Sequence, residues 1–156
     1  MSTFHKDLET GNEFESRLCL MIQKRYPTAT RIPSEFSDYD IYIAETNKKI
    51  ECKYDKKAKE TGNIFIELKS NDNQSGILKS KADYYYIDTG LKLYCIPLIK
   101  LFECVIFEDI KPTKHLVNQG VYEMEMTGCI IPIETFAKYC IQIQPTLMMV
   151  ESVCSI

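Results

Sequence analysis

Histidine is scarce in this chain of 156 residues, and its scarcity argues against several common catalytic sites. His5 and His115 are the only two, and neither lies in a pattern with a serine, a cysteine or a second histidine. A histidine-dependent nucleophilic triad or a zinc site would have to be built from these two residues alone. The sequence therefore favours neither.

Long apolar runs and paired cysteines are also lacking. No hydrophobic stretch approaches the roughly 20 residues that cross a bilayer, and the first seven residues lack the basic-then-apolar order of a signal peptide. The seven cysteines are odd in number and no two are three residues apart, so they suggest neither a disulfide framework nor a CxxC zinc site. Several lie among apolar residues, as free core cysteines do. We expect an intracellular protein of the reducing cytoplasm that does not bind membranes.

Composition and length predict one ordinary globular domain over residues 1–156. Hydrophobic residues make up 45% of the chain and charged residues 26%, and no repeat or linker divides it. A helix, a run of strands and then strand–helix units predict an α/β fold, or an α+β fold with a mixed sheet. Hydrophobic spacing and turn residues predict helices over 12–26, 98–105 and 132–139, and strands over 40–44, 50–54, 64–69, 84–88, 93–97 and 128–132.

Charge is unevenly distributed along the chain. The formal net charge is −3, but residues 48–81 carry nine lysines and only five acids, between two acidic segments. A basic segment inside an acidic protein is typical of a confined phosphate-binding face. The alternative is a solvated, lysine-rich surface. The candidate nucleic-acid contacts are Lys56, Lys57, Lys79 and Lys81.

The most informative stretch runs from Asp40 to Lys53. Ten residues separate Asp40 from Glu51, and one separates Glu51 from Lys53. Because side chains alternate along a strand, Glu51 and Lys53 should face the same side of the sheet, with Cys52 on the other. If residues 40–44 and 50–54 pair as a hairpin with its turn at 47–49, Asp40 lies beside the second strand. Two carboxylates and one ammonium group then share one cluster.

Such a cluster has the groups that phosphodiester hydrolysis needs. Carboxylate oxygens are the ligands that Mg²⁺ prefers, and bound Mg²⁺ both activates water and stabilises charge on the phosphate. A lysine on the same face can orient the water and offset the phosphoryl charge. Glu15 flanks the apolar stripe of the first predicted helix and either reaches the same cleft or is a solvated helix charge.

Several runs of residues resemble the layout of the PD-(D/E)xK nuclease superfamily. They are Gly-Asn-Glu-Phe-Glu at 11–15, Ser-Asp-Tyr-Asp-Ile at 37–41 and Ile-Glu-Cys-Lys at 50–53. Three later runs, at 61–67, 75–77 and 81–85, are similar to phage and mobile-element members that resemble Holliday-junction resolvases. The resemblance covers about residues 11–100. It implies a restriction-endonuclease-like mixed β-sheet core flanked by helices.

The resemblance also implies an activity and a set of site residues. The activity would be Mg²⁺-dependent endonuclease cleavage of DNA, selective for branched structure, with Mn²⁺ as a substitute. Asp40 and Glu51 would be the metal ligands and Lys53 the motif lysine. Glu15 would be the helix glutamate that some members use in catalysis, and Glu67 an ancillary acid. Resolvase-like relatives act as dimers, so a homodimer is one option, and a viral or phage protein would act in the host cytoplasm.

Two rivals to this assignment come from the sequence itself. Tyr39 stands where the family pattern has proline, so Asp38 competes with Asp40 for the role of metal ligand. We prefer Asp40 because it directly precedes the apolar strand. Glu67-Leu68-Lys69 is a second ExK run, but its spacing from Asp40 is long.

Two other interpretations of function remain. The same fold without turnover would be a nucleic-acid-binding or protein-interaction module, which the net negative charge favours. Alternatively, the charged cluster is a surface ion-pair patch of little energetic value, and the acidic ends bind a basic partner. The run Tyr84-Tyr85-Tyr86 could stack on bases, although one buried tyrosine with half-exposed neighbours is the commoner arrangement.

Overall fold

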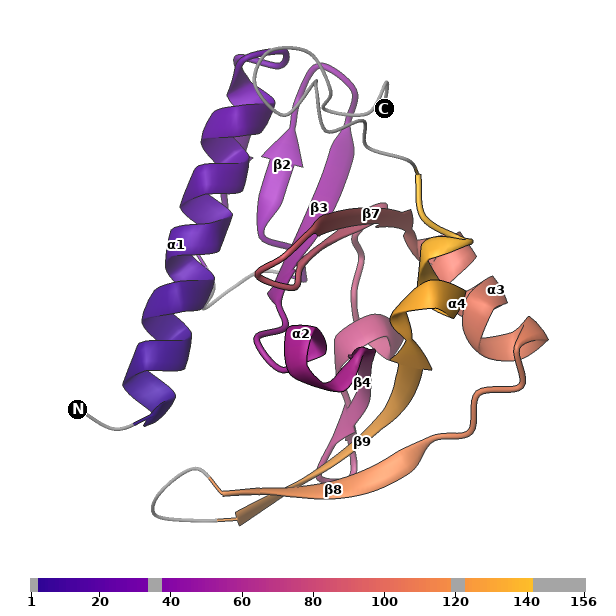
Figure 1. Cartoon of the computed structure of the whole chain (residues 1–156). Helices are drawn as coiled ribbons and strands as arrows, with labels where there is room; N and C mark the ends of the chain where they lie inside the picture. Colours follow the sequence, from indigo (N-terminus) through magenta and orange to yellow (C-terminus); the bar gives the residue numbers. More distant parts are fainter. Residues whose placement is uncertain (1–2, 34–37, 119–122, 142–156) are drawn as a thin grey trace.

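The computed structural model describes residues 3–33, 38–118 and 123–141 and contains two β-sheets flanked by helices (Figure 1). The strands of the first sheet are β1 (Thr30–Arg31), β2 (Ile41–Ile43), β3 (Lys48–Tyr54), β6 (Tyr84–Asp88) and β7 (Leu93–Pro97). Those of the second are β4 (Asn63–Ser70), β5 (Asn73–Gln74), β8 (Thr113–Asn118) and β9 (Glu123–Pro132). The helices are α1 (Thr3–Gln23), α2 (Ala58–Thr61), the 3-10 turn η2 (Gly76–Leu78), α3 (Leu98–Phe107) and α4 (Ile133–Ala137).

The two sheets differ in type. The first has the order β1-β2-β3-β6-β7 and is mixed, because β3 and β6 run parallel while its other neighbours are antiparallel. The second has the order β5-β4-β9-β8 and is antiparallel throughout. The molecule therefore has the predicted mixed class, and α+β describes it best.

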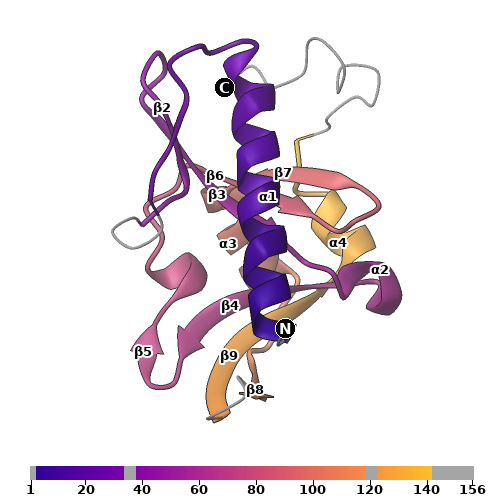
Figure 2. The same cartoon turned by 90° about the vertical axis from the view of Figure 1, so that its left-hand side faces the viewer.

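Helix α1 covers one face of the first sheet (Figure 2). Its apolar residues recur at helical spacing, so Phe14, Leu18 and Ile22 are all buried against the sheet. Ile41 and Ile50, from β2 and β3, belong to the same core. This layer holds the β2–β3 hairpin in place.

A second, larger core lies on the other face of the first sheet. It contains Tyr85 and Ile87 of β6, Ile64 and Ile66 of β4, and Phe136 of α4, all buried. Buried residues of α3 and β9 join it as well. The first sheet is thus packed on both faces, and strand β6 sends Tyr86 into the α1 core and its two neighbours into the other.

Asp55 joins the two sheets at the end of β3. Its backbone N–H donates to the Asp88 carbonyl oxygen at 2.8 Å, and its Oδ2 accepts the Phe65 N–H at 3.0 Å. One residue therefore contacts β6 in the first sheet and β4 in the second. The sheets meet at this point.

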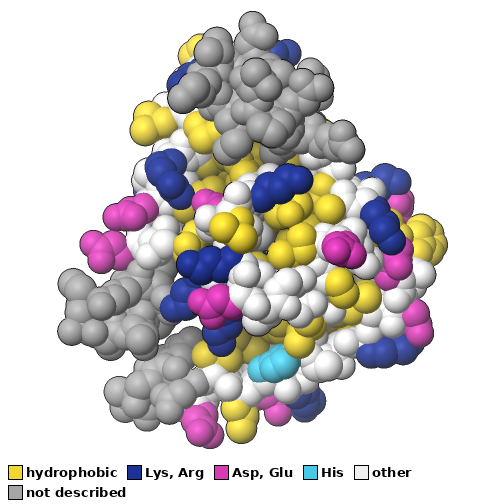
Figure 3. All heavy atoms as spheres, in the orientation of Figure 1, with side chains coloured by type: hydrophobic (Ala, Val, Ile, Leu, Met, Phe, Trp, Pro, Cys, Tyr) yellow, Lys and Arg dark blue, Asp and Glu magenta, His cyan; other side chains and the backbone are white. Residues whose placement is uncertain are grey.

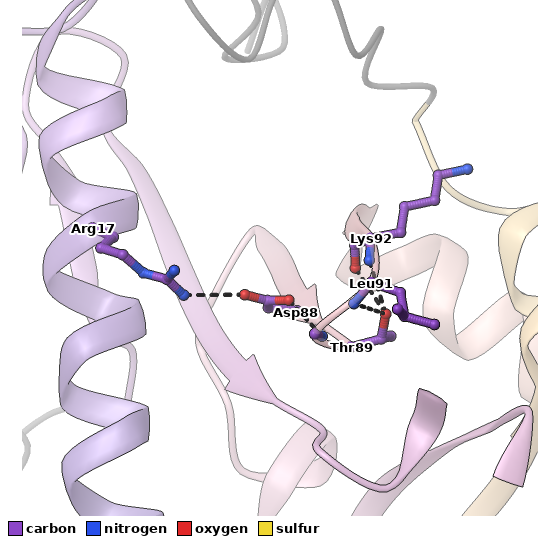
Figure 4. A network of polar contacts seen from close by, with 6 residues as sticks. Arg17, Asp88, Thr89, Leu91 and Lys92 are labelled. Atoms are coloured by element: carbon purple, nitrogen blue, oxygen red, sulfur yellow. Dashed lines mark hydrogen bonds and ion pairs between the residues drawn. The ribbon is translucent and has the colours of Figure 1, made fainter. Parts of the chain in front are cut away.

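A polar network connects α1 to the turn between β6 and β7 (Figure 4). Arg17 Nη2 lies 3.2 Å from Asp88 Oδ2, and the other Asp88 oxygen accepts the Gly90 N–H at 2.7 Å. The buried Thr89 hydroxyl donates to the Lys92 carbonyl oxygen at 3.0 Å. Arg17 is well exposed, so the network orients the turn more than it stabilises the fold.

Several sequence-based expectations need correction. The first helix begins at Thr3 rather than residue 12, and the hairpin turn lies at residues 44–47, where Asn47 adopts a φ of 53°. Lys48 and Lys49 therefore belong to β3 rather than to the turn. Two tyrosines of the 84–86 run are buried, not one, because they point into opposite cores. Strands β1, β5 and β8, helix α2 and the division into two sheets were not predicted.

Two other expectations concern cysteines and membranes. Among the described residues the cysteines are free, and most of them are buried. Cys154 lies outside the described residues. In the same part of the chain, no helix is both long and apolar enough to cross a bilayer.

We expect opposite effects from alanine at two glycines. Gly76 has a φ of +50°, and a Cβ there would lie 2.1 Å from the Glu67 carbonyl oxygen, so Gly76→Ala should destabilise the protein by about 2 kcal/mol or more. Gly11 is inside α1 with open space around it, so Gly11→Ala should stabilise by about 0.5–1 kcal/mol. Denaturant unfolding of both variants measures this, and equal stabilities would contradict the close packing of η2 on β4.

Candidate active site

The β2–β3 hairpin places Asp40 beside Glu51. Ile41 pairs with Ile50, and the Asp40 N–H continues the ladder by donating to the Ile50 carbonyl oxygen at 2.8 Å. Beyond this pair, Asp40 Oδ2 accepts the Cys52 N–H at 2.7 Å. The Asp40 carboxylate thus accepts a hydrogen bond that a further strand residue would accept in a longer ladder. This bond fixes the carboxylate against β3.

Glu51 and Lys53 share one face of β3. Ile50 points into the α1 core, so alternation sends Glu51 and Lys53 to the opposite side. Their partners on the parallel strand β6 are Tyr85 and Ile87, which belong to the second core. The expectation that Glu51 and Lys53 face together is confirmed.

The two carboxyl groups repel each other in a partly desolvated environment. Burial raises the pKa of Asp40 to about 6, and the charge of Glu15 adds to the rise, while the Cys52 N–H lowers it. Burial raises the pKa of Glu51 further, to about 8, with contributions from the charges of Asp40 and Glu15. Near neutral pH the cluster therefore carries less negative charge than its number of acids suggests. A bound cation would favour the ionised form of both Asp40 and Glu51.

Lys53 is half-buried between this cluster and the second sheet. Burial lowers the pKa of its ammonium group, and the charges of Asp55, Glu67 and Glu51 oppose the shift. Lys53 Nζ lies 5.3 Å from the centre of the Phe65 ring on β4. The lysine thus connects the carboxylates on the first sheet with an aromatic surface on the second.

Glu15 reaches the cluster from α1. Its side chain is 15% exposed and forms an ion pair with Arg31 of β1. The Arg31 guanidinium also donates to the Ser16 hydroxyl at 2.8 Å and to Asn12 Oδ1 at 3.2 Å. Its charge raises the pKa of both Asp40 and Glu51. Glu15 is therefore not a solvated helix charge. Arg31, which the sequence analysis did not single out, holds it near the other two acids.

The structure separates the two rival aspartates. Asp38 Oδ2 lies 2.6 Å from Lys81 Nζ, and this hydrogen bond keeps the pKa of Asp38 below its usual range. Asp40 instead bonds to the backbone of β3, beside Glu51. The geometry favours Asp40 as the acid of the cluster.

The rival ExK run lies on β4. The register of β4 against β9 shifts between Glu67 and Lys69, and this bulge breaks the alternation that would place the two on one face. Glu67 accepts a hydrogen bond from the Ser75 hydroxyl, and its charge acts on the pKa of Lys53. It lies at the border of the cluster, as the ancillary role requires.

The four candidate phosphate-binding lysines fall on two sides of the cluster. Lys81 pairs with Asp38, and the charge of Lys79 also acts on the pKa of that aspartate. Lys56 and Lys57 follow the end of β3, where with Lys53 they line a groove of about 520 Å³. The basic segment therefore borders the acidic cluster on either side.

The donor set suits some metals better than others. Within residues 3–33, 38–118 and 123–141, no group of three or more His, Cys, Asp or Glu side chains is placed to hold a metal ion. Asp40 and Glu51 supply two carboxylates, and Glu15 is already paired with Arg31. Two carboxylates fit a cation such as Mg²⁺, which keeps several of its waters, rather than a fully protein-bound zinc ion.

Comparison with models of protein families, with curated proteins and with solved structures finds no match to this chain. The resemblance to PD-(D/E)xK nucleases therefore rests on the residue pattern. The geometry adds an observation independent of that pattern, because Asp40, Glu51 and Lys53 gather where β2 begins beside β3.

We expect Glu51→Gln to stabilise the protein in a pH-dependent way in the absence of divalent cations. The pKa of Glu51 rises on folding from 4.5 to about 8, so ionising it costs free energy that grows as pH climbs through this range. Glu51→Gln should behave like wild type near pH 4.5 and gain about 1 kcal/mol or more by pH 8.5, a rise in Tm of several degrees. Thermal unfolding in chelator measures this.

Glu60→Gln, on the exposed surface of α2, controls for the loss of one acid. Its difference from wild type should not change with pH in the same way. Adding Mn²⁺ should raise the Tm of wild type at pH 8 and leave Glu51→Gln unchanged. A pH-independent difference between Glu51→Gln and wild type would contradict the desolvated environment of Glu51.

Proposed function

We propose that this protein is a Mg²⁺-dependent deoxyribonuclease that hydrolyses phosphodiester bonds in DNA. One observation carries the proposal: the hairpin register, the Asp40–Cys52 hydrogen bond and the alternation of β3 bring Asp40, Glu51 and Lys53 together where β2 begins beside β3. Two acids whose pKa values are raised by burial and by the charges of neighbouring acids favour a divalent cation as their partner.

Asp40 and Glu51 would hold the cation through their carboxylate oxygens. When bound, Mg²⁺ would lower the pKa of a coordinated water and stabilise charge on the scissile phosphate. The hydrogen bond from the Cys52 N–H to Asp40 Oδ2 fixes one of these carboxylates in advance. A preorganised ligand loses less conformational entropy on binding.

Lys53 would act on the reacting groups directly. Its position between Glu51 and the second sheet allows it to orient the attacking water and to offset charge on the phosphate. Glu15 adds negative charge to the cluster, and Arg31 holds it there. The lysines on either side would bind neighbouring phosphates of the strand.

The resemblance to resolvase-like PD-(D/E)xK nucleases supports finer proposals. These are endonuclease cleavage with preference for branched DNA, Mn²⁺ as a substitute cation, a homodimer as one form, and action in the cytoplasm, that of the host if the protein is viral. They rest on the residue pattern over about residues 11–100.

One observation favours a second candidate function. In the described part of the chain, Asp40 and Glu51 supply two carboxylates to the cluster, and no third acid is placed with them as a metal ligand. A nucleic-acid-binding module that keeps the fold without turnover would show the same arrangement. Metal-independent DNA binding with no cleavage in either Mg²⁺ or Mn²⁺ would favour this alternative.

Conservative replacements at the cluster test the nuclease. Asp40→Asn, Glu51→Gln and Lys53→Met should each lower the cleavage rate by about 100-fold or more, because each removes a charge that stabilises the transition state. The assay is cleavage of plasmid, single-stranded and branched DNA in Mg²⁺, in Mn²⁺ and in chelator. Circular dichroism should show that the three variants keep their fold.

The pair Asp109 and Lys111 provides matched controls. They form an exposed ion pair after α3, so Asp109→Asn and Lys111→Met change the same charges away from the cluster. Both should cleave at the wild-type rate. Wild-type rates in all three cluster variants would end the proposal.

A further inference from the structure

The groove beside Lys53 has a mixed apolar and basic lining. It lies between the end of β3, α2 and the strands β8 and β9, with a volume of about 520 Å³. Phe65, Ile130 and Leu116 line it on the second sheet, and Lys56 and Lys57 line it near α2. Figure 3 shows basic side chains gathered over α2, next to hydrophobic side chains over the second sheet. A volume of this size is typical of a ligand site.

The aromatic part of the groove is held in place by packing. A Cβ at Gly128 would lie 2.4 Å from the Phe65 ring, so the ring lies directly against the backbone of β9. The His115 ring meets Phe65 edge-on, with 5.4 Å between ring centres and an interplanar angle of 89°. His115 Nε2 is in turn 2.7 Å from the Thr113 hydroxyl. These contacts leave Phe65 little freedom to turn away from the groove.

The apolar lining is exposed to an unusual degree for residues of this kind. Leu116 is 71% exposed and Ile130 41% exposed, and both line the groove. Exposed apolar surface next to polar residues is typical of binding sites. The ligand should therefore present an apolar surface to the second sheet.

The charges beside the apolar lining indicate the rest of the ligand. Lys53, Lys56 and Lys57 contribute three ammonium groups, and among the described residues that line the groove Asp55 is the one acid. Asp55 Oδ2 already accepts the Phe65 N–H, so part of its charge is directed to the backbone. A flat apolar group attached to a phosphate, as in a nucleotide, complements this arrangement.

We propose that this groove binds an unpaired nucleotide of a DNA strand, with the base against Phe65 and Ile130 and a phosphate on Lys57. A base pair inside a duplex is stacked on both faces and cannot offer one to the apolar wall formed by Phe65, His115 and Ile130. The substrate is therefore DNA with a single-stranded segment. This inference rests on the proposed nuclease function, because Lys53 belongs to both sites and places the unpaired nucleotide next to the phosphate that is cut.

Binding in chelator tests the groove without cleavage. Fluorescence anisotropy would compare an oligothymidylate of about 15 nucleotides with a blunt duplex of the same length. Wild type should bind the single strand more tightly. Phe65→Leu should weaken single-strand binding by about fivefold or more, whereas Phe65→Tyr, which keeps the ring, should retain it. Ile99→Ala, at an exposed apolar residue of α3, is the control and should bind like wild type.

The salt dependence of binding tests the phosphate contact. Lys57→Ala should reduce the slope of log affinity against log salt by about one, and Lys100→Ala, on α3, should leave the slope unchanged. If Phe65→Leu fails to fold, His115→Ala and Ile130→Ser test the same wall from β8 and β9. Either should weaken single-strand binding, with little change for the duplex.

Several outcomes would overturn the inference. They are equal affinity for duplex and single strand, single-strand affinity that none of the wall variants changes, and binding only of uncharged apolar ligands. If Glu51→Gln loses cleavage while all wall variants bind single strands normally, the proposed nucleotide site in the groove is wrong and the proposed nuclease activity stands. If wild type cleaves no DNA but Phe65→Leu weakens single-strand binding, the proposed nuclease activity is wrong and the groove stands as a binding site.

Discussion

The position of strand β3 between two cores is the constraint on which the site depends. Ile50 is fully buried against α1, and the parallel register with β6 fixes which residues face the opposite core. A shift of one residue would send Ile50 out of its core and turn Glu51 and Lys53 toward α1. The burial of a hydrophobic side chain thus determines where the charged ones point, and the chemistry of this edge follows from the packing of the sheet.

Most of the strands and the three longest helices were predictable from the sequence because their signals are local. Period-two alternation and turn residues are enough to place β3, β6 and β7 within a few residues. The hairpin that joins Asp40 to Glu51 followed from the same signals. Strand β8 was missed because its apolar residues, Leu116 and Val117, are adjacent and give no period-two alternation, and β1 because two residues carry no periodicity.

The parts of the site that depend on long-range pairing were not predictable. Nothing local connects Phe65 with His115, which meet because β4 and β8 flank β9. The ion pair between Arg31 and Glu15 likewise forms because β1 lies beside α1 in the fold. The preference for Asp40 over Asp38 came from the sequence, but the salt bridge that occupies Asp38 joins it to Lys81, far along the chain. Each of these contacts requires knowledge of which elements are neighbours in space.

The double role of Asp55 has a mechanical consequence. Its backbone is bonded to β6 and its side chain to β4, only two residues after Lys53. The two sheets are therefore pinned together close to the lysine, so relative motion between them would be smallest there and larger toward the far ends of β8 and β9. A polymer that lies across the junction would therefore meet a rigid corner. The distance between its contacts with the two sheets would be set there by three consecutive residues, 53–55.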